Sequence, residues 1–498
     1  MNALNKTIFI RAISWLSVVL AIQIFTGCAT VGPDYVPPKA SVSPIWHTEL
    51  KGGLGVEGMS PQALAAWWRT LNDPGLSSLI DRAVSGNLNL KKALASVREA
   101  RAKRGVAKAN LFPTLDATGS ADWTYASPSS STNTGSSSSI STSTSTSTGS
   151  QELYAASFDA GWEIDIFGGT RRSVEAATGD LQASEEDLRN VLVSLLAEVA
   201  SNYVEVRTYQ ARIVAAEANL ETQAETYQLT LWRYQAGLSD ELAVQQARYN
   251  LENTRSQIPT LRTGLEEAMN RIAVLLGEQP GKVHEELDKQ APIPVTPLKV
   301  VVGVPADVLR RRPDIRKAER QLAAQTARIG VATADLYPKF TLSGSIGLEA
   351  LSLSNLPFSN SLTLSGGPKI TWSIFKGGAI RQNIKQQSAL QEQYLIAYEA
   401  AVLSALEEVE NALVAYAKEQ QKRQSLSDAT QAAKKAVELA QHKYQAGLTD
   451  FTSVLETERS LLSFQDQLAQ SDGTVTSNLV RLYKALGGGW TSMAADKN

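Results

Sequence analysis

Two seven-residue segments, Tyr234-Gln-Ala-Gly-Leu-Ser-Asp240 and Tyr444-Gln-Ala-Gly-Leu-Thr-Asp450, are nearly identical and lie in long helix-like surroundings. The glycine in each copy suits the left-handed residue that follows a helix, and the next leucine can fold back onto the last turn. The hydroxyl residue and the aspartate that end each copy can cap the following helix. Each segment predicts the tip of an antiparallel helical hairpin, formed by Tyr234, Gly237, Leu238, Ser239, Asp240, Tyr444, Gly447, Leu448, Thr449 and Asp450.

The duplication extends beyond the two tips. Asn110-Leu-Phe-Pro113 recurs as Asp335-Leu-Tyr-Pro338, and Ile166-Phe-Gly-Gly169 recurs as Ile374-Phe-Lys-Gly-Gly378. Each half is therefore expected to run helix, two short segments, very long helix, tip and helix. The expected divisions are a signal peptide at 1–27, an N-terminal extended segment at 28–72, a first repeat at 73–280, a linker at 281–304, a second repeat at 305–490 and a tail at 491–498.

The composition favours long exposed helices over ordinary globular domains. Only 18 Pro, 10 Phe and 4 Met occur among 498 residues, which argues against a large aromatic core. The net charge of -2 gives no reason to expect a nucleic-acid partner. A single cysteine excludes a disulfide within one chain, so this thiol needs another role.

That role is indicated at the N-terminus. Lys6 and Arg11 precede an apolar run from Ala12 to Phe25, and small residues stand directly before Cys28. The run is shorter than the roughly 20 residues that a spanning helix needs, so it predicts a secretory signal that ends at a lipidated cysteine. The covalent lipid on Cys28 is the only non-protein group expected, without a metal or another cofactor, and no later stretch predicts a spanning helix.

Two segments in each half change to a period of two. The expected strands are 113–126 and 152–167 in the first half, and 338–349 and 361–375 in the second. Each carries apolar residues on one face and polar residues on the other, over a length that suits a tilted transmembrane strand. A soluble β-sandwich could show the same alternation in any one strand, but four such strands in duplicate favour the membrane.

Four strands cannot close a barrel, and open edges in lipid would leave backbone groups unpaired. The chain is therefore expected to oligomerise, with every copy contributing four strands around a wet lumen. Five acids and two bases are expected to face this lumen, which leaves it net negative: Asp116, Asp122, Asp159, Glu163, Asp165, Lys339 and Lys369. The Ser/Thr-rich tract 127–150 cannot bury a core and predicts a flexible extracellular loop.

The segments 170–235 and 379–445 contain no proline, and their apolar residues recur every three or four positions. This spacing predicts coiled-coil packing. At 1.5 Å per residue each helix would be about 100 Å long, far more than a globular domain requires. Shorter helices are expected to follow the tips at 241–277 and 451–486. A polar-lumen barrel that carries such helices suggests a conduit across a compartment.

Several separated motifs resemble the outer-membrane efflux factors of the TolC/OprM (NodT) type. They are Cys28 with Gly32-Pro-Asp-Tyr35, Trp67-Trp-Arg-Thr-Leu-Asn-Asp-Pro74, and Leu309-Arg-Arg-Arg-Pro-Asp-Ile315 with Ala318-Glu319 and Ile329-Gly330. The match covers essentially the whole mature chain. The resemblance implies a mainly α fold with a β-barrel contribution: a homotrimer that completes a 12-stranded barrel in the outer membrane, a periplasmic α-barrel and an equatorial domain.

The resemblance also implies partners. They are a periplasmic adaptor (membrane fusion protein), which is expected to dock at the tips, and an inner-membrane pump of the RND type. Acidic rings at the closed mouth of related proteins correspond here to Ser453-Val-Leu-Glu456, so only Glu456 carries over, with Phe451 and Ser453 as further aperture residues. In the first half Leu242-Ala243 replaces a Leu-Asp pair, so a gate-locking carboxylate is absent there. Tyr234 and Tyr444 can serve either tip packing or a gating bond.

Two readings stay open for Arg310-Arg-Arg312. The residues alone favour a solvated helix start before Pro313-Asp314, whereas the resemblance places them among hydrogen bonds between elements of the equatorial region. For the whole chain, the expected function is passive conduction of pump substrates across the periplasm and outer membrane. Alternatives are the exit duct of a type I secretion system, and a non-conducting envelope-spanning scaffold or adhesin. An enzyme is disfavoured, since no nucleophile motif, phosphate-binding loop or metal-ligand spacing occurs.

Overall fold

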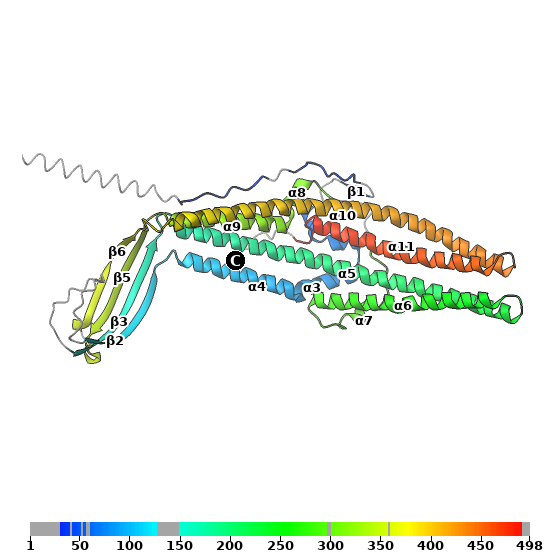
Figure 1. The fold of residues 1–498 in the computed structure, drawn as a ribbon, viewed down its shortest axis with the longest axis horizontal. Coiled ribbons are helices and arrows are strands. Elements are labelled where there is room, and N and C mark those ends of the chain that lie inside the picture. The colour runs from blue at the N-terminus through cyan, green and yellow to red at the C-terminus, as the bar shows by residue number, and fades with distance from the viewer. Residues whose placement is uncertain are drawn as a thin grey trace, which may run out of the picture. The chain divides into compact units, whose positions relative to one another are not determined.

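A computed structural model describes residues 30–39, 42–50, 53–55, 60–126, 149–295, 300–356 and 359–490. Cys28 and the tract 127–148 lie outside these residues, so the predicted lipid anchor and extracellular loop stay predictions. The described chain consists mostly of helices, together with one four-stranded sheet (Figure 1). The predicted class, mainly α with a contribution of antiparallel strands, is confirmed.

The chain divides into two compact units. One unit contains the sheet and takes its residues from Met1–Val36, Ala100–Asp180 and Leu322–Gln393. The other is helical and takes its residues from Pro37–Glu99, Leu181–Gln321 and Tyr394–Asn498. Both halves of the duplicated sequence therefore contribute to both units, as the repeated order of elements predicts.

The sheet unit holds β2 (Thr114–Ala126), β3 (Gly149–Ile164), β5 (Lys339–Ala350) and β6 (Leu362–Thr371). They lie in the order β2-β3-β5-β6, and every neighbouring pair is antiparallel. Alternating small polar and bulky apolar residues favour extended backbone with two distinct faces. All four predicted strands are confirmed, although β3 and β6 end three or four residues earlier than expected.

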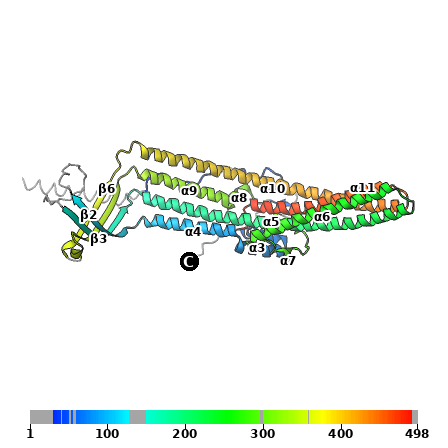
Figure 2. The same ribbon diagram turned by 60° about the horizontal axis from the view of Figure 1, so that its bottom comes forward.

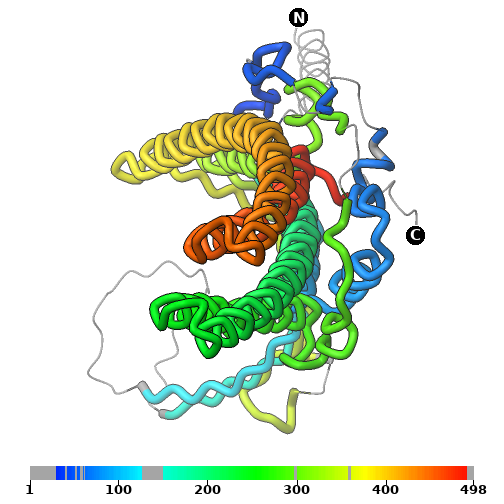
Figure 3. The backbone as a smooth tube through the Cα atoms, turned by 90° about the vertical axis from the view of Figure 1, so that its right-hand side faces the viewer, coloured from blue at the N-terminus to red at the C-terminus, as the bar shows by residue number. Residues whose placement is uncertain are grey.

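The long helices are also confirmed. α5 spans Gly169–Gln235 and α10 spans Ala379–Gln445, each without a break over 67 residues. The helices after the tips are α6 (Glu241–Leu276) and α11 (Phe451–Ala485). In the helical unit, the tip ends of these four helices share one apolar cluster, and Figures 2 and 3 show α6 and α11 folding back beside α5 and α10.

The single helix expected at the start of each repeat is wrong. The first repeat opens with α3 (Pro74–Gly86) and α4 (Leu88–Ala109), separated at Asn87. The Asn87 amide donates to the Leu275 carbonyl at 2.8 Å, and its oxygen accepts from the Leu90 backbone N–H at 2.9 Å. Asn87 therefore caps α4 while it binds the end of α6, and this dual role breaks the helix.

The second repeat opens in the same way, with α8 (Pro305–Arg311) and α9 (Pro313–Ala334). Pro313 disfavours helical geometry at Arg312 and suits the first position of α9, so the break falls between them. The N-terminal segment and the linker are not purely extended either. They hold β1 (Leu54–Gly55), α2 (Pro61–Ala65), a 3-10 turn η1 (Trp67–Leu71), α7 (His284–Leu287) and β4 (Val300–Val301). Strand β4 pairs in parallel with β1. Two further 3-10 turns, η2 (Leu353–Asn355) and η3 (Ser359–Ser361), lie between β5 and β6.

The largest apolar core lies in the helical unit, around Trp67. This side chain is 1% exposed and stacks on Tyr483 at 5.3 Å between ring centroids. Tyr203 is also buried, and its hydroxyl donates to Asp73, the residue that caps α3, at 2.8 Å. Burial raises the pKa of Tyr203 to about 12, so the hydroxyl stays protonated. The Trp67–Pro74 motif thus supplies core and cap residues.

Candidate functional site

The sheet has one polar and one apolar face. The register places Asp116 opposite Asp159, Asp159 opposite Ser345, and Thr341 opposite Lys369. Because side chains alternate along a strand, this register aligns the polar residues of all four strands on one side. Six of the seven predicted lumen residues share this face: Asp116, Asp122, Asp159, Glu163, Lys339 and Lys369.

Asp165 does not belong to this face, so its assignment to a strand is wrong. β3 ends at Ile164, and the Asp165 carboxylate accepts a 2.8 Å hydrogen bond from the backbone N–H of Arg171 in α5. The guanidinium of Arg171 lies 3.4 Å from the same oxygen. The carboxylate satisfies a free N–H in the first turn of α5, and this contact removes it from the strand pattern.

Glu349 is the polar-face acid that the sequence reading missed. It lies on β5 opposite Ala155, at the same parity as Lys339 and Ser345. Continuing the alternation of the strand to its end would have identified it. With Glu349 in place of Asp165, the polar face still carries five acids and two bases per described chain.

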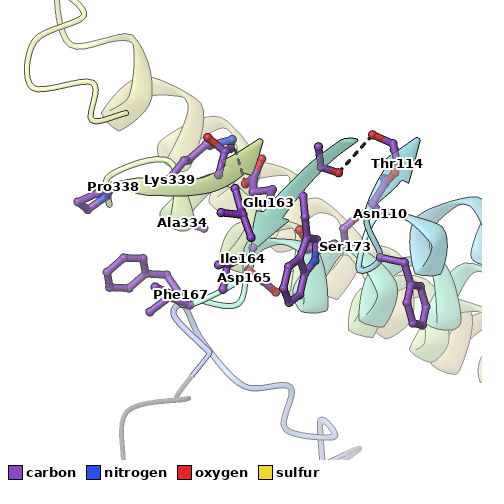
Figure 4. A pocket seen from close by; sticks show the side chains of 18 of the residues that line it. Asn110, Thr114, Glu163, Ile164, Asp165, Phe167, Ser173, Ala334, Pro338 and Lys339 are labelled. Carbon is purple, nitrogen blue, oxygen red and sulfur yellow. Dashed lines mark hydrogen bonds and ion pairs between the residues drawn. The ribbon is translucent and has the colours of Figure 1, made fainter. Parts of the chain in front are cut away.

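The base of the strands forms an open cavity of about 520 Å³ in the sheet unit. Figure 4 shows Glu163 and Lys339 reaching into it from adjacent strands, with Asp165 and Ser173 nearby. The Lys339 ammonium lies 4.0 Å from Glu163 and 3.5 Å from Asp335. These charges are about half exposed, so their pairs are weak and solvated.

The segment after the predicted lipid site is fixed to the sheet unit by Arg172. This guanidinium is 3% exposed and donates to the Val31 carbonyl at 3.1 Å and to Asp34 at 2.6 Å. A Cβ on Gly32 would approach Gly330 to 2.4 Å, so the backbones meet where only glycine fits. The Gly32–Tyr35 and Ile329-Gly330 motifs, far apart in sequence, are therefore one contact.

The two tips have the same backbone but different surroundings. Gly237 and Gly447 have φ of +73° and +70°, as the sequence predicts. Tyr444 is buried and packs on Phe451 at 5.3 Å, with the Arg233 guanidinium 4.6 Å above its ring. Tyr234, its counterpart, is 42% exposed. Tip packing therefore accounts for Tyr444, while Tyr234 presents its ring outward.

Several details of the tips differ from expectation. Leu238 and Leu448 fold back through their backbone, since their N–H groups donate to the Arg233 and Lys443 carbonyls at 2.8 Å, but the two residues are 70% and 76% exposed. Asp240 caps α6 by accepting from Ala243 N–H at 2.9 Å, whereas the side chain of Asp450 makes no such bond. Thr449 donates instead to Ser453 at 3.3 Å.

Of the three predicted aperture residues, only Glu456 is exposed. Phe451 is buried among the tip helices, and Ser453 is half-buried and bonded to Thr449. Within one chain Phe451 therefore packs the tip core rather than an open surface. The exposed leucines, Tyr234 and Glu456 are among the tip side chains available to a second molecule.

A buried carboxylate, Glu458, lies close to Glu456 and was not anticipated. It accepts from Thr226 on α5 at 2.8 Å and from Gln441 on α10 at 3.2 Å. Burial raises the pKa of Glu458, and the two hydrogen bonds oppose this shift only in part. Its buried position beside α5 and α10 follows from helix packing, which no local motif signals.

Arg312 is buried, so the solvated reading of the arginine run is wrong for this residue. Its guanidinium donates to the Ala485 carbonyl at the end of α11 at 2.7 Å, and pairs with Asp314 and Glu408 at 2.7 Å each. Burial opposes the charge, yet these two carboxylates raise the pKa of Arg312 overall. Arg310 is exposed. The hydrogen bonds between elements implied by the resemblance are thus present at Arg312.

Among the residues that the structure describes, no cluster of His, Cys, Asp or Glu has a geometry that could hold a metal ion. In the same residues, no helix combines the length and hydropathy needed to span a bilayer.

The comparisons with known proteins agree with this architecture. A family model described as outer membrane efflux protein matches residues 79–278 and 304–488. The chain is 32% identical to nodulation protein T of Rhizobium leguminosarum bv. trifolii, over 95% of this chain and 96% of that protein. It is also 32% identical to the solvent efflux pump outer membrane protein SrpC of Pseudomonas putida, over 95% and 98%.

Among solved structures, the outer-membrane channel OprN superposes with a TM-score of 0.84 at 35% identity, covering 93% of this chain and all of that chain. The family consists of outer-membrane efflux channels, whose role is transport rather than catalysis. Its two matched segments correspond to the two repeats recognised in the sequence. The chain therefore belongs to the outer membrane efflux protein family.

Proposed function

We propose that this chain, an outer-membrane efflux channel subunit with a large periplasmic part, forms a homotrimeric duct in a tripartite efflux assembly. The duct conducts substrates passively from a periplasmic adaptor and an inner-membrane pump of the RND type. A Pseudomonas putida relative is named as the outer membrane protein of a solvent efflux pump, which supports this placement.

The observation that carries the proposal is the two-faced sheet. Apolar residues of all four strands share one side, including Trp123, Phe158, Ile346 and Leu364, and each of these is more than half exposed within one chain. The opposite side carries the acids, hydroxyls and lysines. A sheet with one side for lipid and one for water suits a membrane channel. Its outer strands β2 and β6 have no further strand partner in the described chain, so closure requires more copies.

The tips are the proposed docking surface for the adaptor. Leu238, Leu448 and Tyr234 are exposed at the tips, and Glu456 adds a charge near the start of α11. Exposed apolar groups with a polar surround are typical of protein contact sites. The lipid on Cys28 is proposed as a second attachment to the outer membrane, because the segment from Val31 to Asp34 is tied to the sheet unit by Arg172.

Single-channel recording in a planar bilayer tests the proposal. The purified trimer is expected to show discrete conductance steps, with longer openings after the exposed tip leucines are replaced by serine. A trimer that inserts into the bilayer but gives no measurable conductance, even with both tips altered, would contradict the proposal. That result would favour a non-conducting scaffold. Replacement of the exposed Arg310 by lysine serves as the matched control, with unchanged conductance.

A further inference from the structure

The two edges of the sheet correspond to the two ends of the duplication. β2 is the first strand of the first repeat, and β6 is the last strand of the second repeat. We infer that β6 of one copy pairs with β2 of the next in one defined register, with Ile370 opposite Gly119 and Lys369 opposite Ser120 of the partner subunit. This inference rests on the homotrimer proposed above and specifies its strand contact.

The first step is that the two hairpins are equivalent. Pro113 directly precedes β2 and Gly119 lies within it, and Pro338 and Gly344 occupy the same places relative to β5. In this alignment Leu115 corresponds to Phe340. In the same alignment Asp116 corresponds to Thr341. Asp116 lies opposite Asp159, and Thr341 lies opposite Lys369, so Asp159 corresponds to Lys369. Counting along β3 and β6 from that pair makes Trp162 correspond to Trp372.

A pair of hydrogen bonds supports this alignment independently. The indole N–H of Trp162 donates to the Leu111 carbonyl at 3.0 Å. The indole N–H of Trp372 donates to the Leu336 carbonyl, also at 3.0 Å. Leu111 and Leu336 occupy the same place in the repeated Leu-Phe-Pro and Leu-Tyr-Pro motifs. The two hairpins therefore have equivalent geometry at these two tryptophans.

The second step uses the junction between the repeats inside one chain. There β3, the exit strand of the first repeat, pairs with β5, the entry strand of the second. Ala160 lies opposite Gly344, Trp162 opposite Leu342, and Asp159 opposite Ser345. The contact between copies joins the same kinds of strand, because β6 is an exit strand and β2 is an entry strand.

Replacing each residue by its equivalent gives the register between copies. Ile370 falls opposite Gly119 of the partner subunit, and Trp372, which directly follows β6, falls opposite the partner subunit's Ala117. Lys369 falls opposite Ser120 of the partner subunit. The pairing is antiparallel, as at the three strand contacts within the chain.

The polar and apolar faces of β2 and β6 test this register independently, because the register was obtained from the duplication alone. Lys369 and Thr371 are polar-face residues of β6, and in this register they meet Ser120 and Thr118 of the partner subunit, which are polar-face residues of β2. A shift by one residue would place Lys369 among the apolar side chains, where an unpaired charge is costly. The derived register therefore keeps both faces continuous across the contact.

A shift by two residues would also keep the faces continuous. In one such alternative Lys369 lies directly opposite Asp122 of the partner subunit, which simple charge pairing would favour. In the inferred register the same two side chains are diagonal neighbours, within reach of a long lysine side chain. Only the duplication distinguishes these two registers, so the experiment must separate them.

Disulfide trapping in outer membranes can distinguish the inferred register from the register shifted by two residues. Directly opposed residues of antiparallel strands have Cα atoms about 4.5–5.5 Å apart, which a disulfide can bridge. The variant Ile370→Cys with Gly119→Cys tests the inferred register, and Ile370→Cys with Ala121→Cys tests the shifted one. The only natural cysteine is Cys28, so the wild type controls for unrelated bonds.

After oxidation and heating without reductant, the first variant should run as two and three linked chains, and reductant should return it to one chain. The shifted variant should give about tenfold less linked product, because its thiols lie two residues apart along the strands. Ala160→Cys with Gly344→Cys, the equivalent pair within one chain, should form its bond without linking chains. Dominant linking of the shifted variant would overturn the inferred register.

A second pair of cysteine variants, on the polar face, tests the same register in case the apolar-face variants assemble poorly. Lys369→Cys with Ser120→Cys should link chains, and Lys369→Cys with Asp122→Cys should not. If an unheated trimer is present and neither register links, the register inference fails while the trimer stands. If the wild type shows no trimer at all, the proposed assembly fails with it.

Discussion

The carboxylate of Glu458 on α11 accepts a 2.8 Å hydrogen bond from the hydroxyl of Thr226 on α5, and Glu458 is only 3% exposed. One of its oxygens, Oε2, has no hydrogen-bond partner among the described residues. Burial raises the pKa of this carboxyl. The packing of the tip therefore favours the protonated acid, since a buried unpaired charge is costly.

This relationship predicts that the tip is more stable in acid. Because the pKa of Glu458 is raised in the folded state, its stabilising contribution is complete below the unfolded pKa of about 4.3 and is lost as the pH rises through the folded pKa. Glu458→Gln should remove this dependence and slow amide exchange of the tip helices at about pH 7.5. Hydrogen exchange measured by mass spectrometry checks this.

His442 on α10 directly follows Gln441, which bonds Glu458, and Arg459, which bonds Asn250 and Tyr249, follows Glu458 on α11. His442 is exposed, so His442→Gln is the control and should leave the pH dependence of the tip unchanged. Faster exchange in Glu458→Gln at neutral pH would show that the charged form supports the tip, contrary to this account.

Valine at either tip glycine should block efflux and leave the trimer intact. A Cβ on Gly237 or Gly447 would meet nothing within 4 Å, so the cost arises from the positive φ alone. That cost is about 1 kcal/mol or more for a β-branched residue. Export of a pump substrate from cells and the unheated trimer band are the two measurements. Asparagine, which tolerates positive φ, should restore efflux; equal loss with asparagine would point to a side-chain effect.

Arg312→Lys should destabilise the helical unit. Lysine keeps the charge but cannot donate to the Ala485 carbonyl and to both carboxylates at once, so we expect a loss of about 2 kcal/mol. A lower dissociation temperature of the trimer on gels would report it. Arg310→Lys, at an exposed position two residues earlier, should change stability by less than about 0.5 kcal/mol. Similar effects at both positions would contradict the importance of burial at Arg312.

Deleting residues 129–148 should leave a heat-resistant trimer. Ala126 and Gly149 are register partners at the open ends of β2 and β3, so a short turn can join the strands without changing their pairing. Trimer bands before and after heating provide the test. If the deletion abolished the trimer, the Ser/Thr tract would have to contribute packing that the strand register does not require.

Neutralising polar-face acids should reduce the cation preference of the channel. Asp159→Asn with Glu163→Gln removes two of the five acids, and Glu349→Gln should act in the same direction. Reversal potentials in a salt gradient should shift toward those of a nonselective pore, most clearly at low ionic strength. Asp165→Asn is the comparison, since Asp165 pairs with Arg171; an equal shift from this variant would return Asp165 to the conducting path.

The amino-acid sequence determined the elements that depend on local periodicity. Strict alternation specified four strands, and the run of three- and four-residue spacings specified two long helices, with α10 beginning and ending where predicted. The repeated Gly-Leu motifs specified the tips, since positive φ is a property of a single residue and its neighbours. The duplication itself was visible because equivalent residues perform equivalent backbone roles.

The tertiary structure decided which side chains are buried, because burial depends on neighbours distant in the chain. Tyr234 and Tyr444 have the same local sequence, yet only Tyr444 is covered, by Phe451 and Arg233. Glu458 and Arg312 became internal through packing of helices that no local pattern joins. Asp165 left the strand because Arg171 binds it at the start of α5. Residues with the same local sequence pattern can therefore be buried or exposed, and contacts with distant parts of the chain decide which.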